Sequence, residues 1–210
     1  MLKIIGKKIK MITLFFNNIK YPCTIIKCKP NRIIYIKKIN TNNYTILLGY
    51  KKTKKLNKPL SGLFLKYNCN NYKKIIQINN LKYDEIKKIK NKKYVDLNYF
   101  KYNKYLDITG KSIGKGFQGV VKKYNFSGVG GKTHGQHNRL RSPGSIGAGS
   151  SPSRVFKGMK MAGRMGNINV TIKKIKIIDI DYLKNILLVK GSIPGKNNNY
   201  LIIKKWKKKL

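Results

Sequence analysis

The chain has 210 residues and carries 48 Lys or Arg but only 6 Asp or Glu, which gives a formal net charge of +42. So much self-repulsion destabilises a compact state in isolation, and a polyanion such as a nucleic acid is the expected partner. The apolar residues lie in short runs, which excludes a membrane-spanning helix. Lysines interrupt residues 1–16, where a secretory signal needs a continuous apolar stretch, so we expect an unprocessed intracellular chain.

The front of the chain, about 1–108, is rich in Lys, Ile and Tyr. Strands are predicted at 9–15, 23–27, 33–39 and 44–48, which are rich in β-branched and aromatic residues and are separated by Asn, Pro or Gly. A helix is predicted around 81–89, because three apolar residues there follow a helical spacing and two carboxylates stand near its start.

The middle of the chain, 110–166, is rich in Gly and Arg. Between Asp107 and Asp179 the sequence runs 71 residues without a carboxylate, while carrying 14 Lys or Arg and both His. The segment also holds four of the five Arg and 14 of the 19 Gly. It therefore has little apolar bulk to pack a core and no anion to neutralise its cations, so we expect it to become ordered on an external polyanion. Local turns are predicted at 142–144 and 151–152.

After the middle segment, strands are predicted at 170–180, 186–190 and 200–205, with turn signals between them. The apolar alternation slips phase between Ile172 and Ile175, which predicts a β-bulge. Many short strands at this spacing are typical of an antiparallel sheet that closes toward a barrel.

The expected fold class is therefore mainly β: an antiparallel β-barrel with a long irregular Gly/Arg-rich loop extension. We expect 1–109 and 167–210 to form the barrel body, with a small inserted helical segment at about 60–92. Residues 110–166 are expected to form the extension loop. A loop of this length is tolerated in a compact protein when it is a binding element.

Three cysteines, Cys23, Cys28 and Cys69, are an odd number without a repeated close spacing. The sequence therefore predicts neither a disulfide framework nor a four-thiolate zinc site. We expect all three to be reduced and structural.

Two glycine patterns resemble nucleotide-binding motifs. Residues 114–119, GKGFQG, match G-x-G-x-x-G, but that motif needs an acidic residue about 20 positions on, and none follows before Asp179. Gly131, Lys132 and Thr133 imitate the end of a phosphate-binding loop, but Phe126 stands where its first glycine is needed. We expect no cofactor and interpret the glycines as places where the backbone can approach phosphates closely.

The two histidines, His134 and His137, are spaced like a metal pair. A metal site needs a third ligand, and no carboxylate or Cys is near them in the sequence. Several serines follow, yet no carboxylate is present to orient a catalytic base. We therefore expect no metal site, no catalytic residue and no enzyme, and we expect the histidines to stack on or hydrogen-bond to nucleotides.

The composition of the middle segment alone is also compatible with a solvated disordered linker. Phe117, Phe156 and three methionines argue against a linker, because such side chains suit a loop that packs into folded RNA. The clustering of Arg points the same way, since a guanidinium binds phosphate bidentately and stacks on bases. The charge would also permit a non-specific basic nucleic-acid-compacting protein, which remains the alternative.

Several short segments of the sequence resemble those of a known family. They are 114–126 (GKGFQGVVKKYNF), 133–135 (THG), 143–147 (PGSIG) and 154–166 (RVFKGMKMAGRMG), with outer matches at 6–11 (GKKIKM) and 187–195 (LLVKGSIPG). In this order they resemble the universal family of large-subunit ribosomal protein three, in its bacterial or organellar type. The resemblance spans nearly the full length of the chain.

The resemblance implies a β-barrel with a long loop that threads through rRNA toward the peptidyl-transferase centre. It implies a structural constituent of the large ribosomal subunit that binds 23S rRNA near its 3′ end and nucleates assembly. The implied partners are the large-subunit rRNA and ribosomal proteins fourteen and nineteen, without a membrane or a small-molecule substrate. The expected location is the ribosome in the bacterial cytoplasm. The alternative is a chain that is encoded in an organelle and belongs to the organelle's ribosome.

The resemblance and the charge pattern together assign the candidate rRNA-binding residues. They are Lys7, Lys8, Lys115, Lys122, Lys123, Asn125, His134, His137, Arg139, Arg141, Arg154, Lys157, Lys160 and Arg164. The family usually has Trp where Tyr124 stands, so a stack at the root of the loop is expected to be weaker. Residues 148–151 lack the glutamine that some bacterial members methylate, so we predict no such modification.

Overall fold

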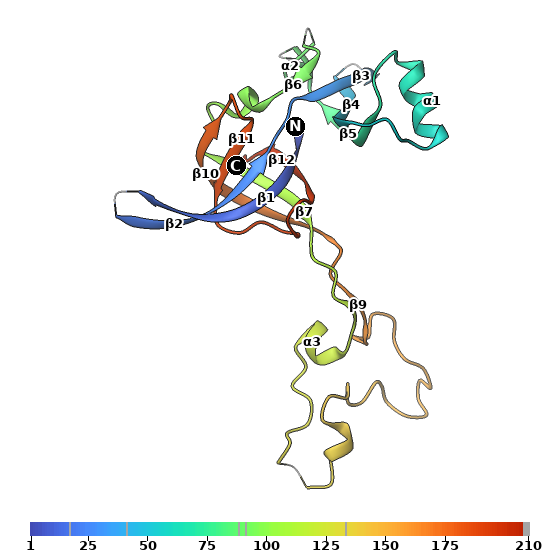
Figure 1. Ribbon diagram of the computed structural model, residues 1–210. Coiled ribbons are helices and arrows are strands. Elements are labelled where there is room, and N and C mark those ends of the chain that lie inside the picture. Colours follow the sequence, from blue (N-terminus) through green and yellow to red (C-terminus); the bar gives the residue numbers. More distant parts are fainter. Residues whose placement is uncertain (17, 41, 88, 91, 133, 208–210) are drawn as a thin grey trace. The chain divides into compact units, whose positions relative to one another are not determined.

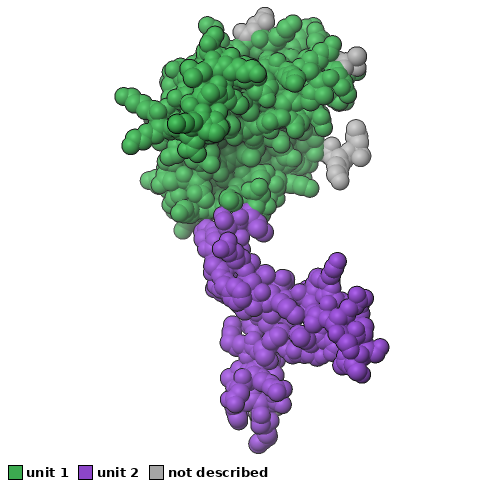
Figure 2. Space-filling view, turned by 90° about the vertical axis from the view of Figure 1, so that its right-hand side faces the viewer, with its two compact units in different colours: residues 1–111, 169–210 green, residues 112–168 purple. Residues whose placement is uncertain are grey.

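The computed structural model describes residues 1–207 except 17, 41, 88, 91 and 133 (Figure 1). The chain divides into two compact units, coloured separately in Figure 2. Met1–Lys111 and Asn169–Leu210 form the first, which we call the barrel unit. Ser112–Ile168 form the second, which we call the basic unit.

Six strands of the barrel unit form a closed barrel in which all neighbours are antiparallel. In the order in which they pair, they are β1 (Lys3–Phe16), β12 (Tyr200–Lys205), β7 (Tyr105–Lys111), β10 (Asn169–Asp181), β11 (Ile186–Lys190) and β2 (Ile19–Lys27). Closure pairs every strand on both sides and so removes exposed sheet edges. The prediction of a mainly β chain built on an antiparallel barrel is confirmed.

Strand β10 contains the irregularity expected from the phase slip in its sequence. Its pairing with β7 shifts register between Ile172 and Ile175, and Lys174 has a φ of 55°. The Lys174 N–H donates to the buried Asp107 carboxylate at 3.0 Å, and Lys204 Nζ lies 3.5 Å from the same carboxylate. The predicted β-bulge is therefore confirmed, and a buried anion stabilises it.

A second sheet of four strands lies beside the barrel within the same unit (Figure 1). Its order is β5 (Tyr72–Leu81), β4 (Asn43–Lys52), β3 (Asn31–Asn40) and β6 (Tyr94–Val95). The expectation that 33–39 and 44–48 belong to the barrel sheet was therefore wrong. Alternating apolar residues predict a strand, but the same alternation serves either sheet, and only the pairing partners decide between them.

Asn31 connects the two sheets at the point where the chain leaves the barrel. Its side chain is fully buried, accepts a hydrogen bond from the Ile5 N–H at 2.9 Å, and donates to the Ile5 carbonyl at 3.2 Å. A buried amide with both ends bonded fixes the backbone next to β1 and β3. The second sheet thereby begins at a defined position on the barrel.

The segment 60–92, expected as a small helical insertion, contains most of one helix, all of a second helix and a strand between them. Helix α1 (Lys58–Lys66) precedes β5, and helix α2 (Tyr83–Lys87) follows it. A 3-10 helix, η1 (Leu97–Phe100), then leads into β7. The helix predicted at 81–89 is therefore shorter than expected, because Leu81 is the last residue of β5 rather than the first of a helical stripe.

Two hydrophobic clusters stabilise the barrel unit. The larger cluster joins the barrel interior to one face of the second sheet and includes Leu106, Ile108, Ile203 and Ile46. The smaller cluster lies under α1, where fully buried Phe64 meets Tyr72 edge to face at 5.9 Å between ring centroids. Burying one such side chain contributes roughly 1.5–3 kcal/mol, so this unit has the core of an ordinary domain.

The basic unit has little regular structure. It contains two short paired strands, β8 (Gly116–Gln118) and β9 (Gly163–Met165), the helix α3 (Val120–Tyr124), and the 3-10 helix η2 (His137–Arg139). Most of its other described residues form turns and irregular backbone. Among its described apolar residues, Val120 alone is buried.

Candidate nucleic-acid interface

The basic unit carries charge of one sign. Its sequence contains ten Lys or Arg, two His and no Asp or Glu, because all six carboxylates of the chain belong to the barrel unit. Most of these cations are exposed. No anion of the unit itself can neutralise them, so its surface is suited to a polyanion.

Strands β8 and β9 bring together two segments that are distant in the sequence. Gly116 pairs with Met165, Phe117 with Arg164, and Gln118 with Gly163. Phe117 is 72% exposed, and Arg164 directly opposite it is also exposed. An exposed aromatic ring beside a guanidinium can stack a base and bind its phosphate, as single-strand-binding surfaces do.

Backbone contacts hold this pair of segments in register. The Lys115 N–H donates to the Met165 carbonyl and the Ser112 N–H to the Ile168 carbonyl, both at 2.9 Å. Gly166 has a φ of 76°, and a methyl group there would overlap the Ile113 carbonyl oxygen. A glycine is therefore required at this position for the two segments to approach.

Helix α3 follows β8 and carries three of the expected residues. Lys122 is exposed, and Asn125 ends the helix in the left-handed conformation with a φ of 60°. Lys123 is half-buried: its Nζ lies 5.0 Å from the Tyr124 ring centroid and donates to the Met161 carbonyl at 3.5 Å. Lys123 thus links α3 to the segment that precedes β9, while the side chain of Lys122 is exposed to solvent.

The remaining expected residues of the basic unit lie on irregular backbone. His134, His137, Arg139, Arg141, Arg154, Lys157 and Lys160 are all exposed. The Arg154 guanidinium lies 5.5 Å from the Phe156 ring centroid, so cation and ring form a second exposed pair of the Phe117 and Arg164 kind. Thr133, which belongs to two of the motifs, lies outside the described residues.

A turn within this stretch depends on another glycine. Gly128 has a φ of 72°, and a methyl group there would overlap the Leu140 carbonyl oxygen, to which the Val129 N–H donates at 3.3 Å. The segments before and after the histidines are therefore held side by side. This contact brings Arg139 and Arg141 close to the end of α3 without any side-chain core.

Lys7 and Lys8 of β1 lie in the barrel unit and differ in their surroundings. Lys7 is half-buried. Lys8 is only 7% exposed, and its Nζ donates to the Ile193 and Gly195 carbonyls, each at 2.8 Å. Burial lowers the pKa of Lys8. Its ammonium is directed to the loop before β12 and is not offered to an external ligand.

The described residues form neither a metal site nor a membrane-spanning helix. Among them, no three His, Cys, Asp or Glu side chains lie close enough together to hold a metal ion. All three cysteines are free, and burial raises the pKa of Cys23, Cys28 and Cys69. No described helix is long and apolar enough to cross a membrane.

Sequence reasoning did not single out the exposed aliphatic side chains of the basic unit. Ile113, Leu140, Ile146, Val155 and Ile168 are all exposed, although such residues are usually buried in a domain of this kind. Their exposure could have been predicted from their position, because the surrounding segment is too rich in glycine to bury them. The surface of this unit is therefore both cationic and apolar.

The fold and this surface define a mainly β protein with a separate, carboxylate-free unit whose charge and exposed rings are those of a polyanion-binding protein. A family model, that of ribosomal protein L3, matches residues 33–185. The protein named large ribosomal subunit protein uL3 of Chloroherpeton thalassium is 41% identical over 210 residues, which cover 95% of this chain and 97% of the relative. The protein of the same name from Chlorobium phaeobacteroides is 41% identical over 209 residues, covering 98% of this chain and 99% of the relative. The chain therefore belongs to the ribosomal protein L3 family.

Proposed function

We propose that the chain is a structural constituent of the large ribosomal subunit and that its basic unit binds the large-subunit rRNA. The relatives that match almost end to end are bacterial, which favours a ribosome in a bacterial cytoplasm. The finer parts of the proposal are that the chain binds rRNA early, near its 3′ end, and nucleates assembly. The basic unit then extends toward the peptidyl-transferase centre, and proteins fourteen and nineteen of the subunit are neighbours of the barrel unit.

One observation carries the RNA-binding role: the basic unit exposes what a folded domain normally buries. Nine large apolar side chains of this unit are exposed, namely Ile113, Phe117, Leu140, Ile146, Val155, Phe156, Met159, Met161 and Ile168. They stand among ten cations with no carboxylate. A unit of this composition gains its missing packing and its counterions together when it binds inside folded RNA.

The physical mechanism follows from these two properties. Cations on an irregular backbone neutralise phosphates of RNA segments that would otherwise repel each other. Glycines let the backbone enter places too narrow for side chains. Exposed rings and methionines fill apolar gaps between bases, so specificity comes from the shape of folded RNA and from stacking rather than from groove readout. The chain would act by binding and positioning, with no catalytic step.

The proposal is tested by replacing Arg139, Arg141, Arg154 and Arg164 together with Lys. The net charge is unchanged, but a lysine cannot grip phosphate bidentately or stack as a guanidinium does. We expect cells that depend on this variant to accumulate large-subunit precursors in sucrose gradients. A matched control replaces four exposed lysines of the barrel unit, Lys37, Lys38, Lys54 and Lys55, with Arg. Normal subunit profiles for the Arg-to-Lys variant would refute the proposed role of the basic unit.

A competition assay separates this function from general nucleic-acid compaction. A protein that relies on phosphates alone loses affinity steeply with salt for every polyanion, whereas a shape-specific protein keeps its preference. We expect the full chain to prefer the large-subunit rRNA over duplex DNA of equal length, with a preference that survives at high salt. Equal affinities at every salt concentration would support the compaction alternative instead.

A further inference from the structure

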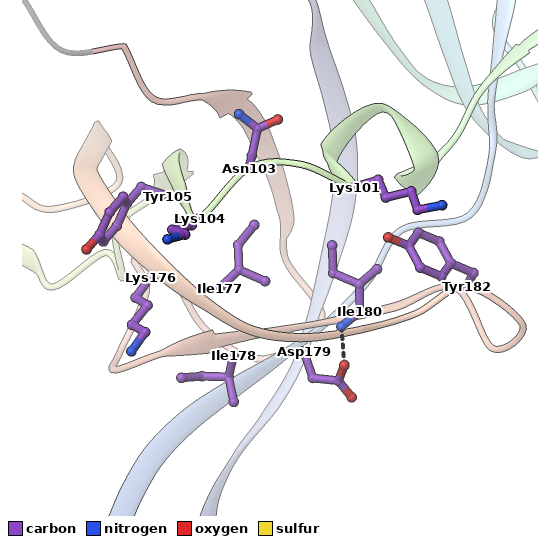
Figure 3. A pocket seen from close by; sticks show the side chains of 10 residues that line it. All are labelled: Lys101, Asn103, Lys104, Tyr105, Lys176, Ile177, Ile178, Asp179, Ile180 and Tyr182. Atoms are coloured by element: carbon purple, nitrogen blue, oxygen red, sulfur yellow. Dashed lines mark hydrogen bonds between the residues drawn. The ribbon is translucent and has the colours of Figure 1, made fainter.

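A pocket of about 610 Å³ lies on the barrel unit, and none of the residues that line it belongs to the segments that carry the family resemblance. It is formed by the connection from η1 to β7 and by the second half of β10 (Figure 3). Its volume falls within the range of small-molecule sites, roughly 300–1,000 Å³. The pocket is therefore large enough for one nucleotide.

The side chains around this pocket combine cations with aromatic rings. Lys101, Lys104 and Lys176 supply positive charge, while Tyr105 and Tyr182 supply rings. In Figure 3, Tyr105 and the two lysines near it lie at one end of the pocket, and Tyr182 and Lys101 lie at the other. Lysine and tyrosine around one hollow are the groups that bind a phosphate and stack a base.

The base of the pocket is apolar. Ile177 and Ile180 of β10 lie on the pocket side of the strand in Figure 3, with Asn103 opposite Ile177. Isoleucine side chains in such a position can contact the face of a planar heterocycle, while the polar groups around them can fix its orientation. The amide of Asn103 can both donate to and accept from a base edge.

The one carboxylate that lines the pocket does not oppose this charge. The pairing of β10 with β11 shifts register between Ile177 and Asp179. Ile178 and Asp179 consequently lie together on the opposite side of the strand from Ile177 (Figure 3). The Asp179 carboxylate also accepts the Ile180 N–H at 2.7 Å, so its charge is turned away and partly compensated.

The ring of Tyr105 is held in place by its neighbours. It meets Trp206 edge to face at 5.7 Å, and Lys174 Nζ lies 5.6 Å from the Tyr105 ring and 5.4 Å from the Trp206 ring. A ring fixed in this way loses little freedom when a ligand binds. Trp206 is the only tryptophan of the chain, so its fluorescence reports on this end of the pocket.

We propose that this pocket binds one unstacked nucleotide of a single-stranded RNA segment, with the base on Tyr182 and the isoleucines and the phosphates on Lys101 and Lys104. The proposal rests on the proposed function for the identity of the RNA as rRNA. It adds a contact on the barrel unit that is separate from the basic unit. A chain with two such contacts binds its RNA more tightly than either contact alone, because the second binding event is intramolecular.

The experiment uses the full-length chain and a six-nucleotide oligoadenylate, followed by Trp206 fluorescence at several salt concentrations. The test variant is Lys101→Gln with Lys104→Gln, and the matched control is Lys54→Gln with Lys55→Gln, an exposed pair before α1. Each phosphate contact contributes about 0.7 to the slope of log affinity against log salt for a single strand. We expect the slope of the test variant to become less negative by about 1.4, and that of the control to stay unchanged. Equal slopes for the two variants would overturn the proposal.

A second variant tests the stack without changing charge. Loss of one base-aromatic stack weakens binding by roughly 5- to 150-fold, so Tyr182→Leu should lower the affinity for oligoadenylate by a factor in that range. An unchanged affinity would overturn the assignment of Tyr182. The fluorescence of each variant without RNA must match that of the parent chain, which shows that the barrel is intact.

Two further ligands decide the source of the nucleotide. Adenosine monophosphate that binds as tightly as the oligomer would show a free-nucleotide site and overturn the RNA assignment. A hexaglutamate peptide that gives the same fluorescence change would show an acidic protein partner and also overturn it. Run in parallel, the four-fold Arg-to-Lys variant of the basic unit keeps the Trp206 response. If ribosomal subunits assemble normally with the Arg-to-Lys variant, the proposed function is refuted. If the pocket variants lose the Trp206 response in the same experiments, the proposal for the pocket still stands.

Discussion

Lys8 provides the sharpest test of how the barrel unit is stabilised. Its Nζ donates to two carbonyls, those of Ile193 and Gly195, at 2.8 Å each. Lys8→Met keeps the aliphatic body of the side chain but removes both donors. Hydrogen bonds from a charged group are worth about 1.5–3 kcal/mol each, and the two carbonyls would be left in a largely buried place. We therefore expect the free energy of unfolding of the barrel unit to fall by about 3 kcal/mol.

The measurement is urea unfolding of the full chain, followed by Trp206 fluorescence, since Trp206 packs on Tyr105 of the barrel. With a slope of about 2 kcal/mol per molar urea, the midpoint should fall by about 1.5 M. Lys7→Met is the matched control, because it removes the same charge from the next residue of the same strand, and half-exposed side chains without special contacts usually change stability by less than about 0.5 kcal/mol. Equal midpoints for the two variants would show that the buried ammonium does not support the loop before β12.

Two further variants test contacts of the fold. Gly166→Ala should disrupt the pairing of β8 with β9, because the new methyl group would overlap a backbone carbonyl at a residue with a positive φ. Limited proteolysis should therefore cut the basic unit of this variant faster than that of the control Gly119→Ala, in which the methyl group meets open space. Asp107→Ala should lower the free energy of unfolding by about 1–3 kcal/mol, because it leaves the Lys174 N–H of the bulge without its acceptor. Asp179→Ala is its control, and a loss of similar size there would contradict a special role of the buried carboxylate.

The sequence predicted most of the barrel because its strands alternate apolar and polar residues in the way a half-buried sheet requires. It even located the bulge in β10, since an extra residue shifts the phase of that alternation. It could not assign β3 and β4 to a second sheet, because strand pairing is a long-range property. The helical segment expected at about 60–92 did not give the bounds of helix α1, because Gly62 interrupts a short segment that lacks acidic residues in its first turn.

The candidate interface was predictable to the extent that composition decides it. A run of cations and glycines without a carboxylate cannot form a core, and the exposure of most of its described side chains follows from that. Lys8 shows where such reasoning stops. A lysine in an alternating strand is usually solvated, and the carbonyls that bury Lys8 lie 185 and 187 residues further along the chain.

The position of β12 in the barrel has a consequence for the order of events during synthesis. This strand is translated after the other five barrel strands, yet it fills the place between β1 and β7. Until residues 200–205 have left the exit tunnel, the barrel of the growing chain therefore stays open between β1 and β7. We call this gap the open seam; along it, the backbone groups of both strands lack their hydrogen-bond partners. The basic unit emerges well before that moment, so its cations can meet nucleic acid while the seam is still open. Nascent chains halted before Tyr200 should accordingly be far more susceptible to proteases and to chaperone capture than the completed polypeptide.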